Sequence, residues 1–184
     1  MQGAEIDTEI KSLGDFHEDV IRFDLDDFIG EHGRAFLVHH GPLGKMQFTR
    51  EKKKTLVFEN PAVPAEGTFS PEADYLVFPL HASPLEDGSG ETISIGRSEV
   101  NDVVIPDASV SAFHAFAQVE PNGSLLLQDM NSTNGTFING QRVPSQDSGD
   151  PLPLRSGDRV RLGSVTLTCL LAKEFCNLVN GLLG

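Results

Sequence analysis

Arg97 and a small set of hydroxyl and amide side chains are the residues of this sequence best suited to bind a ligand. Arg97 follows Gly96 at the end of an alternating strand pattern, and a guanidinium in that position can grip a phosphate or a carboxylate through two parallel hydrogen bonds. Ser111, Thr133 and Asn134 offer neutral donors and acceptors in two later segments that read as loops. These residue types suit the capture of a small oxyanion together with a peptide backbone.

The same residues do not form a catalytic set. No serine, histidine and carboxylate occur at a spacing typical of nucleophilic catalysis, and no general base is evident. We expect His114 to be a hydrogen-bonded structural residue. The neighbouring His39 and His40 would point to opposite faces of a strand, which disfavours a metal site. The sequence therefore predicts a binding protein without a metal or cofactor, and not an enzyme.

Short strands are the elements that must position these residues. Between residues 74 and 172, apolar or alternating runs are separated by turn signals, among them Asn-Gly pairs at 122, 134 and 139, which favour tight turns between antiparallel strands. This pattern is typical of an all-β antiparallel sandwich. The expected strands cover residues 75–80, 92–95, 103–105, 115–119, 125–127, 136–138, 160–162 and 165–169.

Residues 1–73 are expected to form an N-terminal extension with α and β elements. Residues 1–15 read as a polar tail, and Asp24 is placed to cap a short helix whose apolar face carries Phe28. Strands are expected at residues 35–38 and 55–58, joined through a charged run at 51–54 that reads as a solvated loop or, alternatively, a basic contact patch. The role of this extension stays open.

Residues 173–184 are expected to form a C-terminal helix. Phe175, Leu178, Val179 and Leu182 follow the spacing of one helical face. We expect this apolar face to pack back on the sandwich. The alternative is a helix that binds a partner or a second copy of the chain.

Composition narrows the class of partner. The formal net charge of −13 disfavours nucleic acids and anionic membranes as partners. No apolar run approaches the ~20 residues that span a bilayer, and the N-terminus lacks an apolar segment, so we expect a cytoplasmic protein. Cys169 and Cys176 match no metal or redox spacing and are expected to be reduced thiols, with a disulfide as the alternative. The oligomeric state is left open.

Four separated motifs of residues 74–172 strongly resemble the forkhead-associated (FHA) family. They are Gly-Arg at 96–97, Ser-x-x-His at 111–114, Asn-Gly-Thr-Phe-x-Asn-Gly at 134–140 and Gly-Asp at 157–158. The resemblance implies a twisted antiparallel β-sandwich whose loops at one end bind a phosphothreonine peptide. It also implies a partner that carries phosphothreonine, as in Ser/Thr kinase signalling.

The resemblance assigns roles to individual residues. Arg97 and Ser111 are expected to contact the phosphate, Thr133 to line the phosphothreonine pocket, and Asn134 to hydrogen-bond the peptide backbone. The remaining motif residues are expected to shape the loops and turns without touching the ligand. These structural residues are Gly96, His114, Gly135, Asn139 and Gly140.

One position departs from the family pattern. Many members carry a basic or amide residue directly after the motif serine, whereas this chain has Ala112. A charge-assisted hydrogen bond contributes ~1.5–3 kcal/mol, so its loss predicts modest affinity unless Arg142 or Arg155 replaces it. Ala112 also supports a second hypothesis, in which the chain is an FHA-like interaction scaffold that binds its partner without phosphate.

Arg97 also has a simpler interpretation, as a surface residue paired with Glu99 or Asp102.

Overall fold

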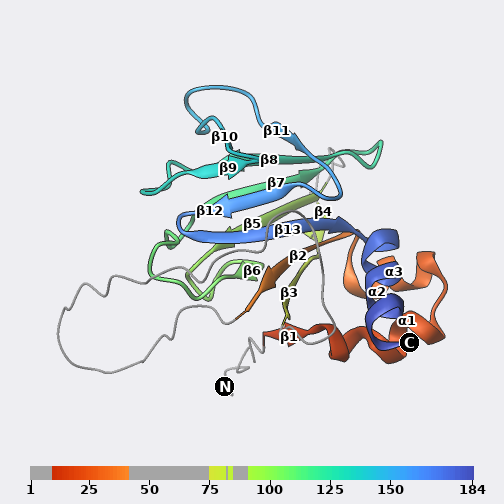
Figure 1. Cartoon of the computed structure of the whole chain (residues 1–184). Coiled ribbons are helices and arrows are strands. Elements are labelled where there is room, and N and C mark those ends of the chain that lie inside the picture. The colour runs from red at the N-terminus through yellow and green to blue at the C-terminus, as the bar shows by residue number, and fades with distance from the viewer. Residues whose placement is uncertain (1–9, 42–74, 82, 85–90) are drawn as a thin grey trace, which may run out of the picture.

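Two β-sheets packed face to face form the body of the molecule (Figure 1). The computed structural model describes residues 10–41, 75–81, 83–84 and 91–184. The first sheet contains, in spatial order, β1 (Lys11–Ser12), β3 (Tyr75–Leu80), β2 (Ala35–His40), β13 (Val165–Leu171), β12 (Arg159–Leu162), β9 (Thr136–Ile138) and β10 (Gln141–Arg142). The second contains β11 (Leu152–Leu154), β8 (Leu125–Asp129), β7 (Ala115–Val119), β5 (Glu91–Gly96) and β4 (Ser83–Pro84), with β6 (Val103–Val104) paired to β5. The predicted all-β sandwich is confirmed.

Alternation along the strands produces the core between the sheets. In β12, Val160 and Leu162 are fully buried while Arg159 and Arg161 point to the outer face of the sheet. In β7 every second residue is buried in the same way. Burying one such aliphatic side chain contributes about 1.5–3 kcal/mol, so the alternation fixes the face that each strand turns inward.

The turn chemistry is partly as predicted. Asn139 and Gly140 both have positive φ, 50° and 83°, in the two-residue connection from β9 to β10. At the other two Asn-Gly pairs only the glycine, Gly123 or Gly135, has a positive φ. One pairing differs from the expected antiparallel scheme, because β6 runs parallel to β5.

A second apolar cluster covers one half of the outer face of the first sheet. It contains the short helices η1 (Leu13–Phe16), α1 (His17–Arg22), α2 (Leu25–His32) and α3 (Ala172–Leu183), and we call this region the helical cap. Asp24 caps α2 as predicted, accepting a hydrogen bond of 2.9 Å from the Asp27 N–H. Phe175 of α3 stacks on Phe36 of β2 with ring centroids 4.0 Å apart, so the predicted C-terminal helix packs back on the sandwich.

The prediction of a polar tail at residues 1–15 is wrong for residues 11–15. β1 and η1 occupy residues 11–16, and Leu13 and Phe16 are buried within the helical cap. Isolated apolar residues in a polar segment become buried only when residues distant in the sequence pack against them, and the local sequence does not show such tertiary contacts. β2, from the same N-terminal segment, lies between β3 and β13 inside the first sheet. The strand expected at 55–58 and the charged run at 51–54 lie outside the described residues.

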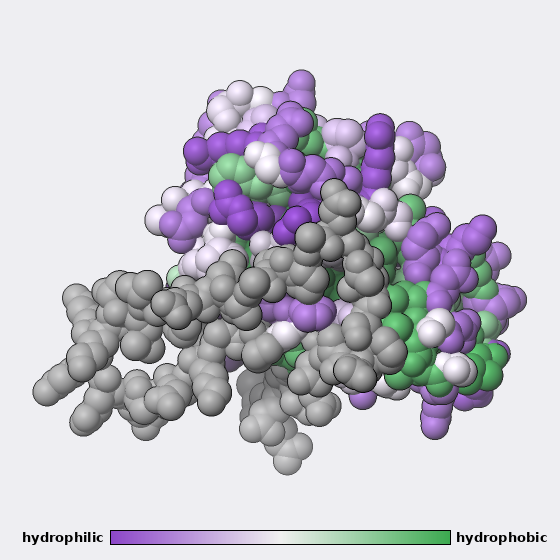
Figure 2. All heavy atoms as spheres, viewed as in Figure 1, coloured by the Kyte–Doolittle hydropathy of each residue, from purple (hydrophilic) through white to green (hydrophobic). Residues whose placement is uncertain are grey.

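The cysteines, the helix lengths and the surface complete the description of the fold. Cys169 is buried and Cys176 half-buried, and both are free thiols; burial raises the pKa of Cys169 to about 12. Among the helices of the described ranges, none combines the length and apolar character needed to cross a membrane. Figure 2 shows hydrophobic residues exposed on the side of the helical cap and mainly hydrophilic residues over the upper strands.

Candidate functional site

The predicted binding residues lie in loops that leave one end of the sandwich, on the left of Figure 1 and away from the helical cap. Ile95 of β5 pairs with Ala115 of β7, which in turn pairs with Asp129 of β8. This register aligns the end of β5, the start of β7 and the end of β8. It therefore brings together the loops at residues 97–102, 105–114 and 130–135.

Arg97 is anchored against the loop that precedes β7. Its backbone N–H donates to the Ser111 carbonyl at 2.9 Å, and its side-chain Nε donates to the Val110 carbonyl at 3.1 Å. The side chain is exposed, and its terminal nitrogens have no hydrogen bond to a residue that the structure describes. The Nε contact orients the planar guanidinium, while the two terminal nitrogens stay available for a ligand.

The simpler reading of Arg97 as a paired surface residue does not hold for the residues seen here. The Asp102 carboxylate accepts hydrogen bonds from the backbone N–H and the hydroxyl of Ser94, each at 2.7 Å. Within the described ranges the ion pair present is that between His32 and Asp19. The positive charge of Arg97 is therefore not neutralised by a described carboxylate.

Ser111 and Thr133 face each other across two loops. The Ser111 hydroxyl oxygen accepts from the Thr133 N–H at 3.1 Å, and the two hydroxyl oxygens are 3.5 Å apart. Together with the bond from the Arg97 Nε to the carbonyl of Val110, which precedes Ser111, this places one guanidinium and two hydroxyl groups in neighbouring loops at one patch of surface. The arrangement presents several hydrogen-bond donors to a single oxyanion.

His114 holds the loop of Ser111 in place through a hydrogen bond from the interior of the sandwich. It is fully buried, and its Nδ1 accepts from the Ser111 N–H at 2.9 Å. Nε2 must then carry the proton, and it donates to the Gly135 carbonyl at 3.3 Å. Burial lowers the pKa of His114, and the hydrogen bond to Gly135 and the charge of Asp129 only partly offset this effect. Both ring nitrogens bond to backbone groups, so His114 is a neutral structural residue and not a base for the Ser111 hydroxyl.

Gly96 occupies a place where a side chain does not fit. A Cβ there would lie 2.3 Å from the Ala112 carbonyl oxygen and 2.9 Å from Nδ2 of Asn101. That Nδ2 donates at 2.7 Å to the carbonyls of both Ser98 and Ala112. Asn101 is buried, and it ties the Arg97 loop to the Ser111 loop across the space that the glycine leaves open.

Asn134 is exposed at the rim of the same loops. Its Nδ2 donates to the Ser109 carbonyl at 2.8 Å, while its side-chain oxygen has no partner among the described residues. The hydroxyl of Ser109 in turn bonds to that of Ser164 at 2.7 Å, which links the loop to the hairpin between β12 and β13. The free amide oxygen can accept a hydrogen bond from the backbone N–H of a ligand.

Asp129 is a supporting residue to which the sequence alone gave no role. It is buried at the end of β8, and its carboxylate accepts from the hydroxyl of Ser132 at 2.5 Å and from that of Thr136 at 2.6 Å. It also accepts from the Ser132 N–H at 3.0 Å. These bonds close the turn that carries Thr133. The signal available in the sequence was a carboxylate followed by a serine three residues later, an arrangement that closes local turns.

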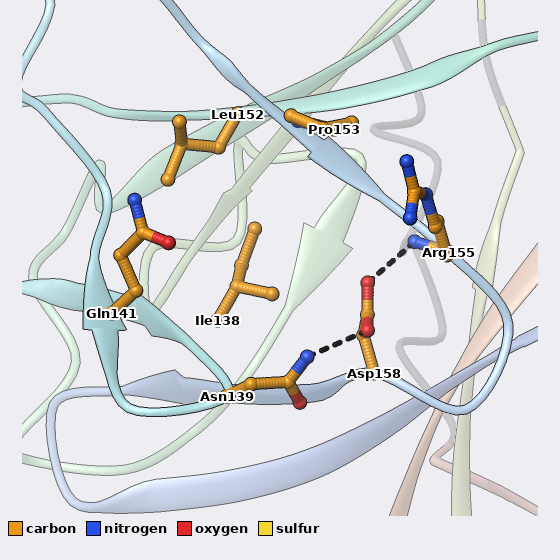
Figure 3. A pocket seen from close by; sticks show the side chains of 7 residues that line it. All are labelled: Ile138, Asn139, Gln141, Leu152, Pro153, Arg155 and Asp158. Carbon is orange, nitrogen blue, oxygen red and sulfur yellow. Dashed lines mark hydrogen bonds between the residues drawn. The ribbon is translucent and has the colours of Figure 1, made fainter.

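Asn139 and Gly140 belong to the family motif but lie at the opposite end of the sandwich. The Asn139 side chain donates to the Asp158 carboxylate at 2.7 Å and accepts from the Arg159 N–H at 2.9 Å. Figure 3 shows this pair at the rim of a cavity of about 250 Å³ that Arg155 also lines, and the Arg155 backbone N–H donates to the Asp158 carboxylate at 2.7 Å. Arg155 is therefore too remote to replace a contact missing beside Ser111.

Arg142 lies much closer to the binding loops. The position of a Cβ added to Gly135 would be 3.6 Å from the Arg142 Nε, and Gly135 directly follows Asn134. Arg142 is exposed and has no side-chain hydrogen bond within the part of the chain described. Of the two arginines considered from the sequence as substitutes for the missing residue at Ala112, the structure brings only Arg142 near the site.

Among the described residues, no three metal-binding side chains come together in a way that could hold an ion. What the site offers is a guanidinium, hydroxyl groups and an amide, which suit hydrogen bonding to an anionic peptide.

Comparison with known proteins gives one family match and several partial relatives. The family model of the FHA domain matches residues 93–163. The chain is 40% identical over 75 residues to an ABC transporter ATP-binding/permease protein of Mycobacterium tuberculosis, covering 41% of this chain and 8% of the relative. It is 34% identical over 79 residues to the glycogen accumulation regulator GarA of Mycolicibacterium smegmatis, covering 43% of this chain and 46% of the relative. The chain thus spans less than half the length of these two relatives.

Among solved structures, the N-terminal FHA domain of Rad53p from S. cerevisiae, in complex with a phosphothreonine peptide, is similar to this chain. The identity is 27%, the TM-score is 0.40, and the match covers 47% of this chain and 72% of the yeast domain.

Proposed function

We propose that this protein binds a phosphothreonine-containing segment of a partner protein, because the family model of the FHA domain matches residues 93–163. The observation that carries the proposal is the convergence of Arg97, Ser111 and Thr133 from three loops on one patch of surface. An unpaired guanidinium beside two hydroxyl groups matches the charge and the hydrogen-bonding needs of a phosphate dianion.

Each residue has a distinct part in this proposal. Arg97 and Ser111 contact the phosphate, Thr133 lines the pocket for the phosphothreonine side chain, and the free amide oxygen of Asn134 accepts from the peptide backbone. Gly96 and His114 hold the loops without touching the ligand. A protein with this site recruits partners that a Ser/Thr kinase has phosphorylated.

The proposal is tested by titrating three matched peptides that differ only at one residue. A degenerate phosphothreonine library first supplies a binding sequence, which is then made with phosphothreonine, phosphoserine or threonine. We expect binding of the phosphothreonine peptide and at least tenfold weaker binding of the threonine peptide. Equal binding of these two peptides would overturn the proposal.

A second candidate function rests on Ala112. Its methyl group supplies no hydrogen bond where many relatives have a basic or amide residue, and it is exposed beside Ser111. A scaffold that binds partners without phosphate would tolerate this loss. The same titration separates the two candidates, since the scaffold binds phosphorylated and unphosphorylated peptides alike.

A further inference from the structure

Three arginines occupy the outer face of the first sheet next to the binding loops. Strand register places Arg142 opposite Phe137, and Phe137 opposite Arg161, so that the three side chains form one row across β10, β9 and β12. Arg159 lies two residues before Arg161 and shares its face, because side chains alternate along a strand. We call Arg142, Arg159 and Arg161 the arginine face.

The row sits directly against the loop that carries Asn134. The Arg161 guanidinium lies over the Phe137 ring at 3.7 Å from its centroid and donates to the Gly163 carbonyl at 2.6 Å. A Cβ on Gly135 would meet the same ring at 3.0 Å and the Arg142 Nε at 3.6 Å. The two arginines therefore flank one aromatic ring, immediately beyond Gly135.

The charges of this face are uncompensated within the described ranges. None of its three arginines forms an ion pair there, although the whole protein carries a formal net charge of −13. Arg161 has a structural task, since it covers Phe137. Arg142 and Arg159 are exposed, and neither has a side-chain hydrogen bond to a described residue. Arg161 is half-buried and its Nη1 bonds to Gly163, but its other terminal nitrogen has no hydrogen bond to a described residue, so it also keeps donors for a ligand.

We propose that Arg142 and Arg161 bind acidic groups of the same partner segment that carries the phosphothreonine. The inference rests on the proposed function and adds a substrate preference to it: a phosphothreonine flanked by carboxylates or by a second phosphate. Guanidinium groups bind both oxyanions by the same paired hydrogen bonds. The phosphate site and the row are joined through Asn134 and Gly135, which are adjacent in the chain.

The reach of the peptide defines where these acidic groups lie. An extended peptide advances about 3.3 Å per residue, and its alternate side chains point the same way. A peptide that bonds to Asn134 therefore meets the row within about two to five residues of the phosphothreonine. Arg159 lies two residues before Arg161 in β12, so only a peptide with a longer run of acidic residues would reach it.

The test uses four phosphothreonine peptides of otherwise equal sequence. One has neutral flanks, one has three glutamates before the phosphothreonine, one has three glutamates after it, and one has a phosphoserine in place of the glutamates on the flank that binds better. Binding is measured to the full chain by calorimetry at two salt concentrations. Exposed ion pairs are weak, so we expect one acidic flank to tighten binding about three- to tenfold, less so at high salt.

The variant Arg142→Gln/Arg161→Gln should remove the advantage of the acidic flank over the neutral peptide. The matched control is Arg22→Gln/Arg155→Gln, which changes net charge equally at sites remote from the loops and should keep the advantage. Arg161 stacks on Phe137, so the single variant Arg142→Gln is measured as well and should lose a large part of the advantage without a change in melting temperature.

The outcomes separate this inference from the function on which it rests. If the neutral phosphothreonine peptide fails to bind wild-type protein, the proposed function itself fails. If it binds but neither acidic flank helps, or if the advantage survives in Arg142→Gln/Arg161→Gln, the arginine face is not a peptide subsite.

Discussion

The two ends of this sandwich are held together by different kinds of interaction. In the helical cap, four phenylalanine rings with at most 1% exposure pack edge-to-face or stacked, with contacts centred on Phe175. At the loop end, buried polar residues support the loops in addition to the apolar core: Asn101, His114 and Asp129 each hydrogen-bond to groups of the loops around them. The groups proposed to meet the ligand lie above them and are exposed or half-exposed.

The difference shows that the residues supporting a recognition site must fix the positions of polar atoms. Apolar packing is non-directional, and it stabilises the cap without fixing any polar atom to a fraction of an ångström. Hydrogen bonds to buried polar groups are directional, and they set the positions of the Ser111 and Thr133 loops. We therefore expect changes in the cap to act on stability alone, and changes at the loop end to act on binding.

The largest expected effect is in the cap. Phe175→Ala removes a ring that is fully buried and stacked on Phe36, and it should lower the free energy of unfolding by about 3–5 kcal/mol in urea titrations. Peptide affinity, measured at a temperature where the variant is folded, should change less than twofold. The control Leu183→Ala, at an exposed position, should have little effect on either quantity. A tenfold loss of affinity in folded Phe175→Ala would break the separation of the two ends.

Arg97→Ala should show the opposite pattern. The loss of two charge-assisted hydrogen bonds, about 3 kcal/mol together, corresponds to a reduction in phosphothreonine-peptide affinity of about 100-fold or more. The exposed side chain contributes little to the fold, so the melting temperature should stay the same. Arg155→Ala, at the other end of the sandwich, should bind as wild type does. Wild-type affinity in Arg97→Ala would refute the assigned site.

His114→Ala should affect both properties, because this residue supports the loops from within. The substitution leaves the Ser111 N–H and the Gly135 carbonyl without their partner and should cost about 2–3 kcal/mol of stability. Peptide binding should weaken indirectly, through displacement of Ser111. The exposed His81 provides a control, and His81→Ala should behave as wild type. An unchanged melting temperature in His114→Ala would count against the structural role.

The smallest expected effect is a pH dependence of stability that arises at the loop end. The pKa of His114 is lowered in the folded state, so below pH 6.5 the unfolded chain takes up a proton that the folded chain excludes. Stability from this residue is complete above pH 6.5 and falls as the pH drops, by at most about 1.4 kcal/mol per pH unit. Urea titrations of wild type and His114→Gln between pH 7.5 and 5.5 should show a shallower slope in the variant. Equal slopes would contradict a neutral, buried His114.

Much of the loop end could be predicted because its signals are local. Alternation defined most strands, and the motif around Gly96 and Arg97 marked where the loops begin. Cap signals were equally local, as Asp24 before α2 shows. By contrast, β11 was missed: Leu152–Leu154 contains a central proline, and it becomes a strand only by pairing with the edge of β8.

Features that depend on tertiary contacts could not be read from the chain. Arg142 and Arg155 both follow the motif at short distance, and only strand pairing shows that one lies beside Gly135 and the other at the opposite end. The role of Asp129 likewise depends on the hydroxyl of Thr136, seven residues away. The burial of Leu13 and Phe16 depends on the aromatic cluster that α3 completes.

The central claim is that the Arg97 guanidinium distinguishes a phosphorylated threonine from a bare one, and NMR of arginine Nε–H groups tests it most directly. The Arg97 signal is identified by its absence from Arg97→Lys, and each peptide is then added to saturation. We predict that the phosphothreonine peptide shifts this signal strongly, while the threonine peptide leaves it in place. An Arg97 signal that stays unmoved in the saturated phosphopeptide complex would contradict the account.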